Sequence, residues 1–452
     1  MDVNWKQFYK SVFTLVIPMA LQNLINVGVS AADVMMLGAV SENVLSGASL
    51  AGQIQYIMTL IFFGLTSGAT VLTAQYWGKK DTRTIEKILG LGLKSGLAIA
   101  VIFGAGTLLI PEQLMRIFTN EPEVISQGVQ YLKIVGVSFV FMAFTQVYLN
   151  IMRSIERVMI ATVIYLVSLC VNVVLNAVLI FGYLGFSPMG VRGAAIATLI
   201  ARIIEFVIVL FYAHYKNKVV KIRIHDVIHS DRLLVKDFLV YSIPVVLNEL
   251  MWGLGGTANT AIIGHLGSAA VAGNSVAQVV RQLAQVVVFG VSGATAIYVG
   301  KTIGEHQYEL AKAYAKRFIW LALIMGTLGG GVILLSAPIA YNVLALTPKA
   351  KDYMVFMFFV MSYFVVAQAV NTVLVVGTFR AGGDTKFGLA LDVGTMWGGS
   401  ILIGAVAAFI FHCSVPVVYV IIMSDEILKL PFTIKRFFSY KWLKDVTREK
   451  LF

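Results

Sequence analysis

Long runs of hydrophobic residues, separated by short polar segments, dominate the pattern of this chain. A helix that crosses a bilayer needs about 20 mostly apolar residues. The pattern predicts twelve such spans, at residues 12–37, 46–76, 88–110, 129–152, 158–183, 191–213, 238–263, 270–300, 317–341, 352–378, 387–411 and 415–435. The composition agrees, because 58% of the residues are hydrophobic and only 13% are charged. We therefore expect an all-α polytopic membrane protein with twelve transmembrane helices.

The pattern of the first half returns in the second half. Residues 17–51, which begin with Ile17-Pro18, recur about 226 residues later as residues 243–277, which begin with Ile243-Pro244. Because both copies run in the same direction, they predict two pseudo-symmetric six-helix lobes around an axis along the membrane normal. The expected division is a first lobe at 1–213, a basic linker at 214–237, a second lobe at 238–436 and a tail at 437–452.

The net charge of +12 is concentrated in alternate loops, in the linker and in the tail. By the positive-inside rule, we expect both termini and the linker on the cytoplasmic side of the plasma membrane. The first apolar run is too long for a signal-peptide core, so we expect it to be retained. Aromatic residues among lysines predict that the tail is a short interfacial helix. The bases form no nucleic-acid recognition module, and no nucleic-acid partner is expected.

Two carboxylates are predicted inside spans, where an ionisable group costs at least about 2.5–3.5 kcal/mol. Asp33 lies late in the first span and Glu249 lies in the seventh. In the alignment of the two halves, Asp33 corresponds to Asn259 and Glu249 corresponds to Asn23. This broken symmetry makes the two acids the leading candidates for ion coupling, and pairing with a neighbouring group is the structural alternative.

Oxygen donors for an ion at Asp33 are available in the same half of the chain. Asn172 and Asn176 are spaced i and i+4, which places them on one helix face. Asn150 and Thr198 complete the candidate set. Such a set can bind Na⁺, or the acid alone can carry a proton. The alternative is hydrogen bonding between helices, which contributes about 0.6 kcal/mol per contact.

Other polar and aromatic residues in the spans are secondary candidates. Arg281 is a candidate counter-ion for Glu249 or Asp392, and Asp392, Arg281 and Asn259 form a candidate polar site in the second lobe. Arg202 and Glu205 are expected to pair at i, i+3. Histidine and cysteine spacings predict no metal site and no cofactor. The candidate residues of an apolar substrate cavity are Tyr56, Phe139, Trp252, Phe289 and Tyr363.

Several short motifs, in their order and spacing, carry a family resemblance. They are Ile17-Pro18 with Asp33 and Gly38, residues 74–78 (AQYWG), Asn172 and Asn176 before residues 179–182 (LIFG), residues 193–198 (GAAIAT), residues 272–275 (AGNS) and residues 380–385 (RAGGDT). Together they resemble the MATE family of multidrug and toxic-compound extrusion proteins over essentially the whole chain.

The resemblance implies export of organic, often cationic, compounds in exchange for Na⁺ or H⁺, by alternating access and without a cofactor. It implies an amino-lobe cation site at Asp33, Asn150, Asn172, Asn176 and Thr198. Some members have an aspartate where Asn176 stands, so both coupling ions stay open. Another branch has its seventh-span glutamate about one turn after Glu249. We expect a monomer that contacts membrane lipid.

Four other classes of protein are alternatives to such a transporter. A lipid-linked oligosaccharide flippase of the same superfamily is the nearest alternative, although it often has fourteen spans and a charged groove. A major-facilitator transporter would carry a glycine-aspartate-arginine loop that residues 78–83 lack. An enzyme would need a convergent catalytic set, which the six histidines do not offer. A non-transporting scaffold or receptor is the alternative from another class.

Overall fold

Helices make up most of the described chain. The structure, a computed structural model, describes residues 4–344 and 346–448, and it contains no β-strand within those ranges. The last residues of the expected tail, 449–452, therefore lie outside the described residues. The elements of the first half are α1 (Trp5–Gly38), α2 (Glu42–Gly78), α3 (Thr82–Leu109), α4 (Pro111–Arg116), α5 (Pro122–Ser154), α6 (Met159–Phe181), α7 (Val191–Phe211), the π-helical η1 (Tyr212–Lys216) and α8 (Ile224–Ile228).

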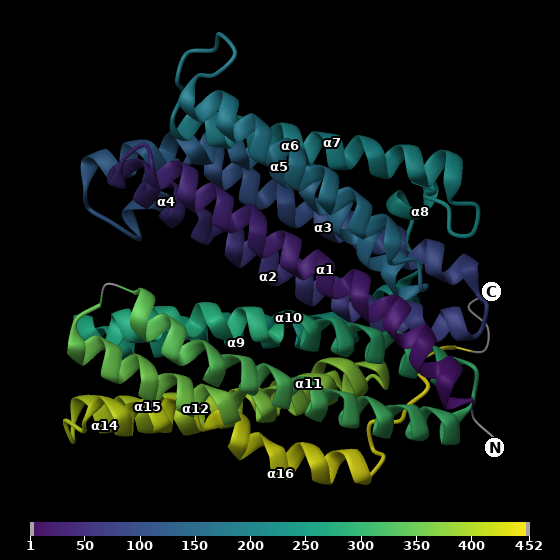
Figure 1. Cartoon of the computed structure of the whole chain (residues 1–452). Helices are drawn as coiled ribbons and strands as arrows, with labels where there is room; N and C mark the ends of the chain where they lie inside the picture. The colour runs from purple at the N-terminus through teal and green to yellow at the C-terminus, as the bar shows by residue number, and fades with distance from the viewer. Residues whose placement is uncertain (1–3, 345, 449–452) are drawn as a thin grey trace. The chain divides into compact units, whose positions relative to one another are not determined.

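The second half begins with four long helices and ends with shorter ones (Figure 1). Two π-helical segments, η2 and η3, interrupt it, and such segments are frequent at functional sites. Its elements are α9 (Arg232–His265), α10 (Ser268–Gly304), α11 (Tyr308–Val343), α12 (Pro348–Thr372), η2 (Val373–Phe379), α13 (Thr385–Asp392), η3 (Val393–Ile401), α14 (Leu402–Phe409), α15 (Val415–Ile422) and α16 (Asp425–Phe438).

The chain forms two compact units, which cross the predicted lobe boundary. Unit 1 comprises residues 1–20, 70–80 and 243–452, and unit 2 comprises residues 21–69 and 81–242. The start of α1 and the end of α2 thus pack with the second half of the chain. In unit 1, for example, Phe8 of α1 stacks on Tyr314 of α11, with ring centroids 4.5 Å apart.

In unit 2, α5 packs against both α3 and α7, and α6 packs against α7. Capping and glycine positions define these helices. Asp81 caps α3 by accepting a hydrogen bond from the backbone N–H of Thr84 at 3.0 Å. α6 ends at Gly182, whose φ of +78° favours glycine. A Cβ on Gly193 would lie 2.7 Å from the carbonyl oxygen of Leu179, so glycine allows α6 and α7 to approach closely.

The linker between residues 214 and 237 belongs to unit 2, where ion pairs dock it on α3. Asp226 of α8 is buried and accepts hydrogen bonds from both terminal nitrogens of Arg83, at 2.5 and 2.8 Å. Glu86 accepts hydrogen bonds from Arg223 at 2.8 Å and from the backbone of Lys221 at 2.9 Å. The sequence predicted a basic linker between the lobes, and the structure attaches this part of it to the start of α3.

In unit 1, the three helices α10, α11 and α12 pack against one another. Large apolar side chains fill the space between α12 and the short helices that follow it. Phe358 and Met361 of α12, together with Tyr419 and Ile422 of α15, are fully buried in this core. The core therefore joins α12 to α15.

Ten helices among the described residues are long and apolar enough to cross a membrane. Two of the twelve predicted spans are not among them. The span at 238–263 lies in α9, which also carries the intramembrane candidate Glu249. The span at 415–435 is interrupted at Met423–Ser424, and α16 starts with two acids, Asp425 and Glu426.

The described part of the tail, residues 437–448, does not form the predicted interfacial helix. α16 ends at Phe438, and residues 443–448 have no regular structure. Trp442 is fully buried and stacks on Phe437 with ring centroids 5.9 Å apart. Gln75 binds the tail through Lys444 O at 3.0 Å and Val446 N at 2.8 Å. These long-range contacts bury the aromatic side chain that composition had suggested for a lipid surface.

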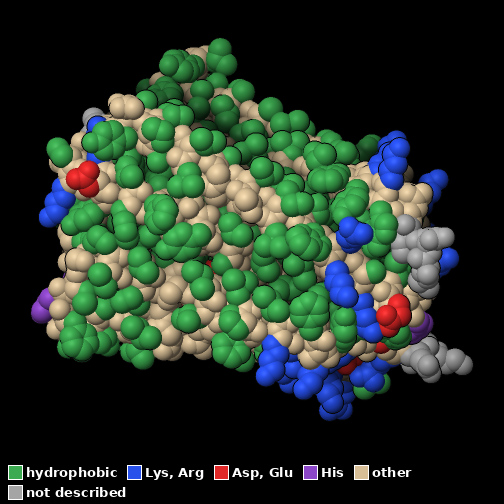
Figure 2. Space-filling model, turned by 60° about the horizontal axis from the view of Figure 1, so that its bottom comes forward, with side chains coloured by type: hydrophobic (Ala, Val, Ile, Leu, Met, Phe, Trp, Pro, Cys, Tyr) green, Lys and Arg blue, Asp and Glu red, His purple; other side chains and the backbone are tan. Residues whose placement is uncertain are grey.

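The surface of the molecule has a clear separation of side-chain types. Figure 2 shows hydrophobic side chains over most of the visible face, with most of the visible Lys and Arg side chains toward its right and lower right edge and a few at its left edge. Exposed large hydrophobic residues are numerous in unit 1, for example Trp320 at 63% and Leu335 at 74% exposure. Exposed side chains of this size, repeated along several helices, are typical of a lipid-facing surface.

Candidate functional site

A cavity of about 550 Å³ lies within unit 2 and is lined by α1, α2, α5, α6 and α7. It is large enough for a drug-sized ligand. Four of the predicted site residues line it: Asp33, Tyr56, Asn172 and Thr198. The cavity thus brings together predicted side chains from four helices, α1 and α2 near the start of the chain and α6 and α7 more than 80 residues later.

Asp33 is held by Asn176 of α6, which also binds Asn172. Asn176 is fully buried, and its side-chain nitrogen donates hydrogen bonds to Asp33 Oδ1 and, at 3.1 Å, to Asn172 Oδ1. The i, i+4 spacing places both amides on one helix face, as predicted. The side-chain oxygen of Asn176 is buried and has no hydrogen-bond partner in the described structure. A buried acceptor without a donor, beside a carboxylate, is a favourable place for a cation.

Thr198 and Asn150 have different places relative to this arrangement. Thr198 lines the cavity, and its hydroxyl group interacts with that of Tyr131. Asn150 lies outside the lining: its side-chain nitrogen donates to Gln146 O at 2.8 Å, and its oxygen accepts from Arg153 at 3.1 Å. Gln146, one helical turn earlier, lines the cavity in its place.

Arg202 and Glu205 also line the cavity. They form the predicted i, i+3 ion pair, in which Nη1 of Arg202 lies 2.9 Å from each carboxylate oxygen. The charge of Arg202 acts electrostatically on Asp33. The i, i+3 spacing accounted for Arg202 by its local partner, so Arg202 was not among the predicted site residues. Its i+4 relation to Thr198 was the signal that both side chains share a face of α7.

Glu249 and Asp392 each lie beside a buried base in unit 1. Arg380 is 3% exposed and pairs with Glu249 at 2.7 Å. Lys429 is likewise 3% exposed and pairs with Asp392 at 2.8 Å. Arg281, the expected candidate counter-ion, instead donates to Gln278 at 2.9 Å and to Gln368 at 3.4 Å. Arg380 lies more than 100 residues after Glu249, and Lys429 lies about 40 residues after Asp392. Local sequence spacing therefore predicted neither pair.

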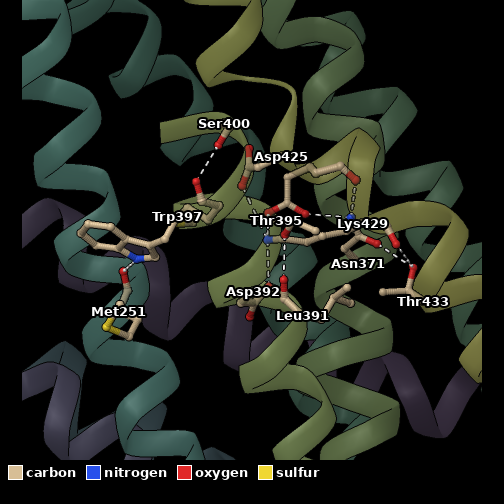
Figure 3. A network of polar contacts seen from close by, with 12 residues as sticks. Met251, Asn371, Leu391, Asp392, Thr395, Trp397, Ser400, Asp425, Lys429 and Thr433 are labelled. Carbon is tan, nitrogen blue, oxygen red and sulfur yellow. Dashed lines mark hydrogen bonds and ion pairs between the residues drawn. The ribbon is translucent and has the colours of Figure 1, made fainter. Parts of the chain in front are cut away.

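Lys429 is the centre of a buried polar network, which Figure 3 shows between α12, α13 and α16. Its ammonium group also lies 3.0 Å from Glu426 and 3.6 Å from Asp425. Asn371 of α12 donates to Glu426 at 2.8 Å. These contacts fix the start of α16 to α12 and α13. The positive end of the α16 dipole adds to the stabilisation of Asp425 and Glu426.

The remaining second-lobe and aromatic candidates are dispersed. Asn259 has a buried side-chain oxygen without a hydrogen-bond partner. Phe139 is a fully buried core residue beside Met58 and Phe62, so its prediction as a cavity-lining residue is wrong for this cavity. The other three aromatic candidates, Trp252, Phe289 and Tyr363, lie in unit 1. Trp252 packs against the apolar core, and the side chains of Phe289 and Tyr363 are each 40% exposed.

Comparison with known proteins supplies the family. The MatE family model matches residues 18–178 and 244–398. A probable multidrug resistance protein NorM of Thermotoga maritima is 23% identical over 445 residues, covering 98% of this chain and 95% of that protein. A probable multidrug resistance protein YoeA of Bacillus subtilis is 21% identical over 395 residues, covering 86% and 85%.

Solved structures show the same fold. An outward-facing multidrug resistance MATE family transporter of the MOP superfamily aligns with a TM-score of 0.85 at 20% identity. A MOP superfamily transporter from Pyrococcus furiosus, described as having a binding pocket of reverse polarity, aligns with a TM-score of 0.86 at 19% identity. Each alignment covers 96% of both chains. These similarities confirm the predicted all-α, twelve-helix fold class, and the family match extends over most of the sequence. The chain therefore belongs to the MatE family of multi-pass membrane transporters and is not an enzyme.

Proposed function

We propose that this protein is a cation-coupled antiporter that exports organic compounds by alternating access, with Asp33 as its coupling carboxylate. The observation that carries the proposal is the arrangement at Asp33: a carboxylate in a cavity, beside the buried and unpartnered oxygen of Asn176. The printed names of the relatives, which describe multidrug resistance proteins, support organic compounds as substrates.

The local chemistry is suited to exchange between an ion and a substrate. Asp33, Asn172 and Asn176 offer oxygen atoms to Na⁺, and Asp33 can take up a proton instead. Either event neutralises the carboxylate and removes its attraction for a cationic ligand in the same cavity. Return of the negative charge restores that attraction, so ion and substrate compete for one site.

The acids of unit 1 are less suited to this role. Glu249 and Asp392 each have a buried basic partner within 2.8 Å. A carboxylate with such a partner is already neutralised, and binding a further cation would cost part of that pairing. The proposal therefore assigns coupling to Asp33 and a structural role to the pairs of Glu249 and Asp392. It places a monomer in the plasma membrane, with both termini in the cytoplasm.

The experiment is efflux from proteoliposomes under separately imposed Na⁺ and H⁺ gradients. Wild-type protein should accelerate efflux of a cationic dye under one of the two gradients. Asp33→Asn should abolish the acceleration, because the amide cannot change its charge. Glu42→Gln, an exposed acid in the first turn of α2 in the same unit, is the matched control and should behave as wild type. Gradient-driven efflux that persists in Asp33→Asn would remove Asp33 from the mechanism.

A further inference from the structure

The cavity of unit 2 contains a guanidinium group that the proposed coupling mechanism does not use. Arg202 lines the same cavity as Asp33 and is bound to Glu205 through Nη1 alone. Its other two nitrogens, Nε and Nη2, have no hydrogen-bond partner among the residues that the structure describes. One edge of the guanidinium therefore remains available.

Exposure is consistent with an edge that faces the cavity. The side chain of Glu205 is 1% exposed, whereas that of Arg202 is 21% exposed. The Nε–Nη2 edge of arginine carries two parallel N–H donors, which match the two oxygens of a carboxylate. Because Glu205 contacts only Nη1, its presence does not block that edge.

The charges of the side chains that line the cavity indicate which charged groups a ligand should carry. Glu205 balances Arg202, so an ionised Asp33 leaves the lining with one negative charge in excess. A ligand with only a cation would satisfy Asp33 and leave the Arg202 edge unused. A ligand with only a carboxylate would meet Arg202 but be repelled by Asp33. A molecule that carries both groups satisfies both side chains.

The rest of the lining suits an organic zwitterion. Tyr56, Tyr131 and Tyr165 provide aromatic faces, and Gln53 and Gln146 provide amide groups. Aromatic side chains with a few placed polar groups are typical of small-molecule sites of this size.

We propose that this cavity selects amphoteric organic compounds, with the ligand carboxylate on the Nε–Nη2 edge of Arg202 and the ligand cation facing Asp33. This inference rests on the proposed function, because it assigns the substrate class of the same site. It adds a specificity residue, Arg202, that is separate from the coupling residue.

The test is equilibrium binding of two dyes that differ in one group. A rhodamine free acid carries a delocalised cation and a carboxylate, and its methyl ester keeps the cation and lacks the carboxylate. Their Kd values are measured by fluorescence anisotropy with protein in nanodiscs, without an ion gradient. Wild-type protein should bind the free acid about tenfold or more tightly than the ester, as expected for a charge-assisted bidentate contact.

Two variants remove the contact in different ways. Arg202→Gln with Glu205→Gln deletes both charges without leaving a buried acid unpaired, and it should reduce the preference for the free acid to about one. Arg202→Lys keeps the charge beside Glu205 but lacks the planar edge, and it should lower the preference several-fold while the Kd of the ester stays unchanged. Arg192→Gln is the control, because Arg192 lies at the start of α7, outside the cavity lining, and contacts Gln130.

Equal affinities of wild-type protein for the two dyes, or an unchanged preference in Arg202→Lys, would overturn the inference. Failure of the proposed function has a different signature. It appears as ion-driven efflux that survives Asp33→Asn, and this binding assay, made without a gradient, does not depend on that result.

Discussion

Substitution of Asp226 by asparagine should release the linker from unit 2 and lower the stability of the protein. Asp226 is 3% exposed, and Arg83 donates to both of its oxygens. A hydrogen bond to a charged group contributes about 1.5–3 kcal/mol when it is well buried. Arg83 is 42% exposed, so solvent screens the pair, and asparagine retains one acceptor. We therefore expect Asp226→Asn to cost about 1–2 kcal/mol of unfolding free energy.

The sign of the pH dependence follows from the surroundings of Asp226. Burial raises the pKa of Asp226, but the hydrogen bonds and charge of Arg83 outweigh burial and hold the pKa below its ordinary value of 3.8. The stabilisation is thus fully present above the ordinary pKa and is lost as the pH falls through the lower pKa of the folded state. The difference between wild type and Asp226→Asn should be constant from pH 7 to about 5 and should shrink below about pH 4.

The assay is a double-mutant cycle of Asp226→Asn and Arg83→Gln, measured by denaturant titration in detergent micelles. The exposed pair Arg116–Glu112, with side chains 65% and 56% exposed, is the matched control, and its coupling should stay below about 0.5 kcal/mol. A coupling between Asp226 and Arg83 no larger than that of the control would refute this explanation. A stability difference as large at pH 3 as at pH 7 would refute it too.

Three further substitutions test the packing and the buried charges. Phe139→Ala removes a fully buried ring and should cost about 3–5 kcal/mol in the same titration. Gly193→Ala should reduce the yield of monodisperse protein in size-exclusion chromatography, because its Cβ would meet a neighbouring helix at 2.7 Å, whereas Gly28→Ala, with open space around it, should not. Lys429→Met leaves buried acids without their base and should lower the unfolding free energy by about 3–5 kcal/mol. Adding Asp392→Asn should restore part of that loss. If the losses of the two single variants simply add in the double variant, the network is contradicted.

The pattern of apolar residues was sufficient to predict the fold class, because a long apolar run in a membrane protein usually forms a transmembrane helix. Helices alone satisfy the backbone within a single segment in lipid. The exceptions are informative. The run at 415–435 contains Asp425, Glu426 and Lys429, and averaging over that run concealed the break before α16. The two acids followed three and four residues later by a base were the local signal of the new helix start.

The site could be predicted where helix geometry was sufficient. The i, i+4 spacing of Asn172 and Asn176 predicted one face, and Asn176 donates hydrogen bonds to both Asp33 and Asn172. On α5, Gln146 lines the cavity, whereas the predicted Asn150, one turn later, does not. Which of the two faces the cavity depends on the rotation of α5 about its axis. That rotation follows from packing against α3 and α7, which no local pattern encodes.

Ion pairs between distant segments were beyond the sequence analysis. Arg380 and Glu249 lie on different helices, and their pairing depends on how η2 and α9 meet. The tail shows the same limit. Trp442 has the composition of an interfacial anchor, but Gln75 binds the backbone on both sides of Asp445 and the ring becomes buried. In both places, tertiary contacts decided between burial and exposure.

The most direct test of Asp33 as the coupling residue is ion movement driven by substrate. Proteoliposomes without an imposed ion gradient receive an inward gradient of a cationic dye, while internal pH and the movement of radioactive sodium are followed together. The account predicts that wild-type protein moves one of the two ions outward as the dye enters, and that Asp33→Asn moves neither. Ion movement of wild-type size in Asp33→Asn, or dye entry into wild-type vesicles without movement of either ion, would contradict it.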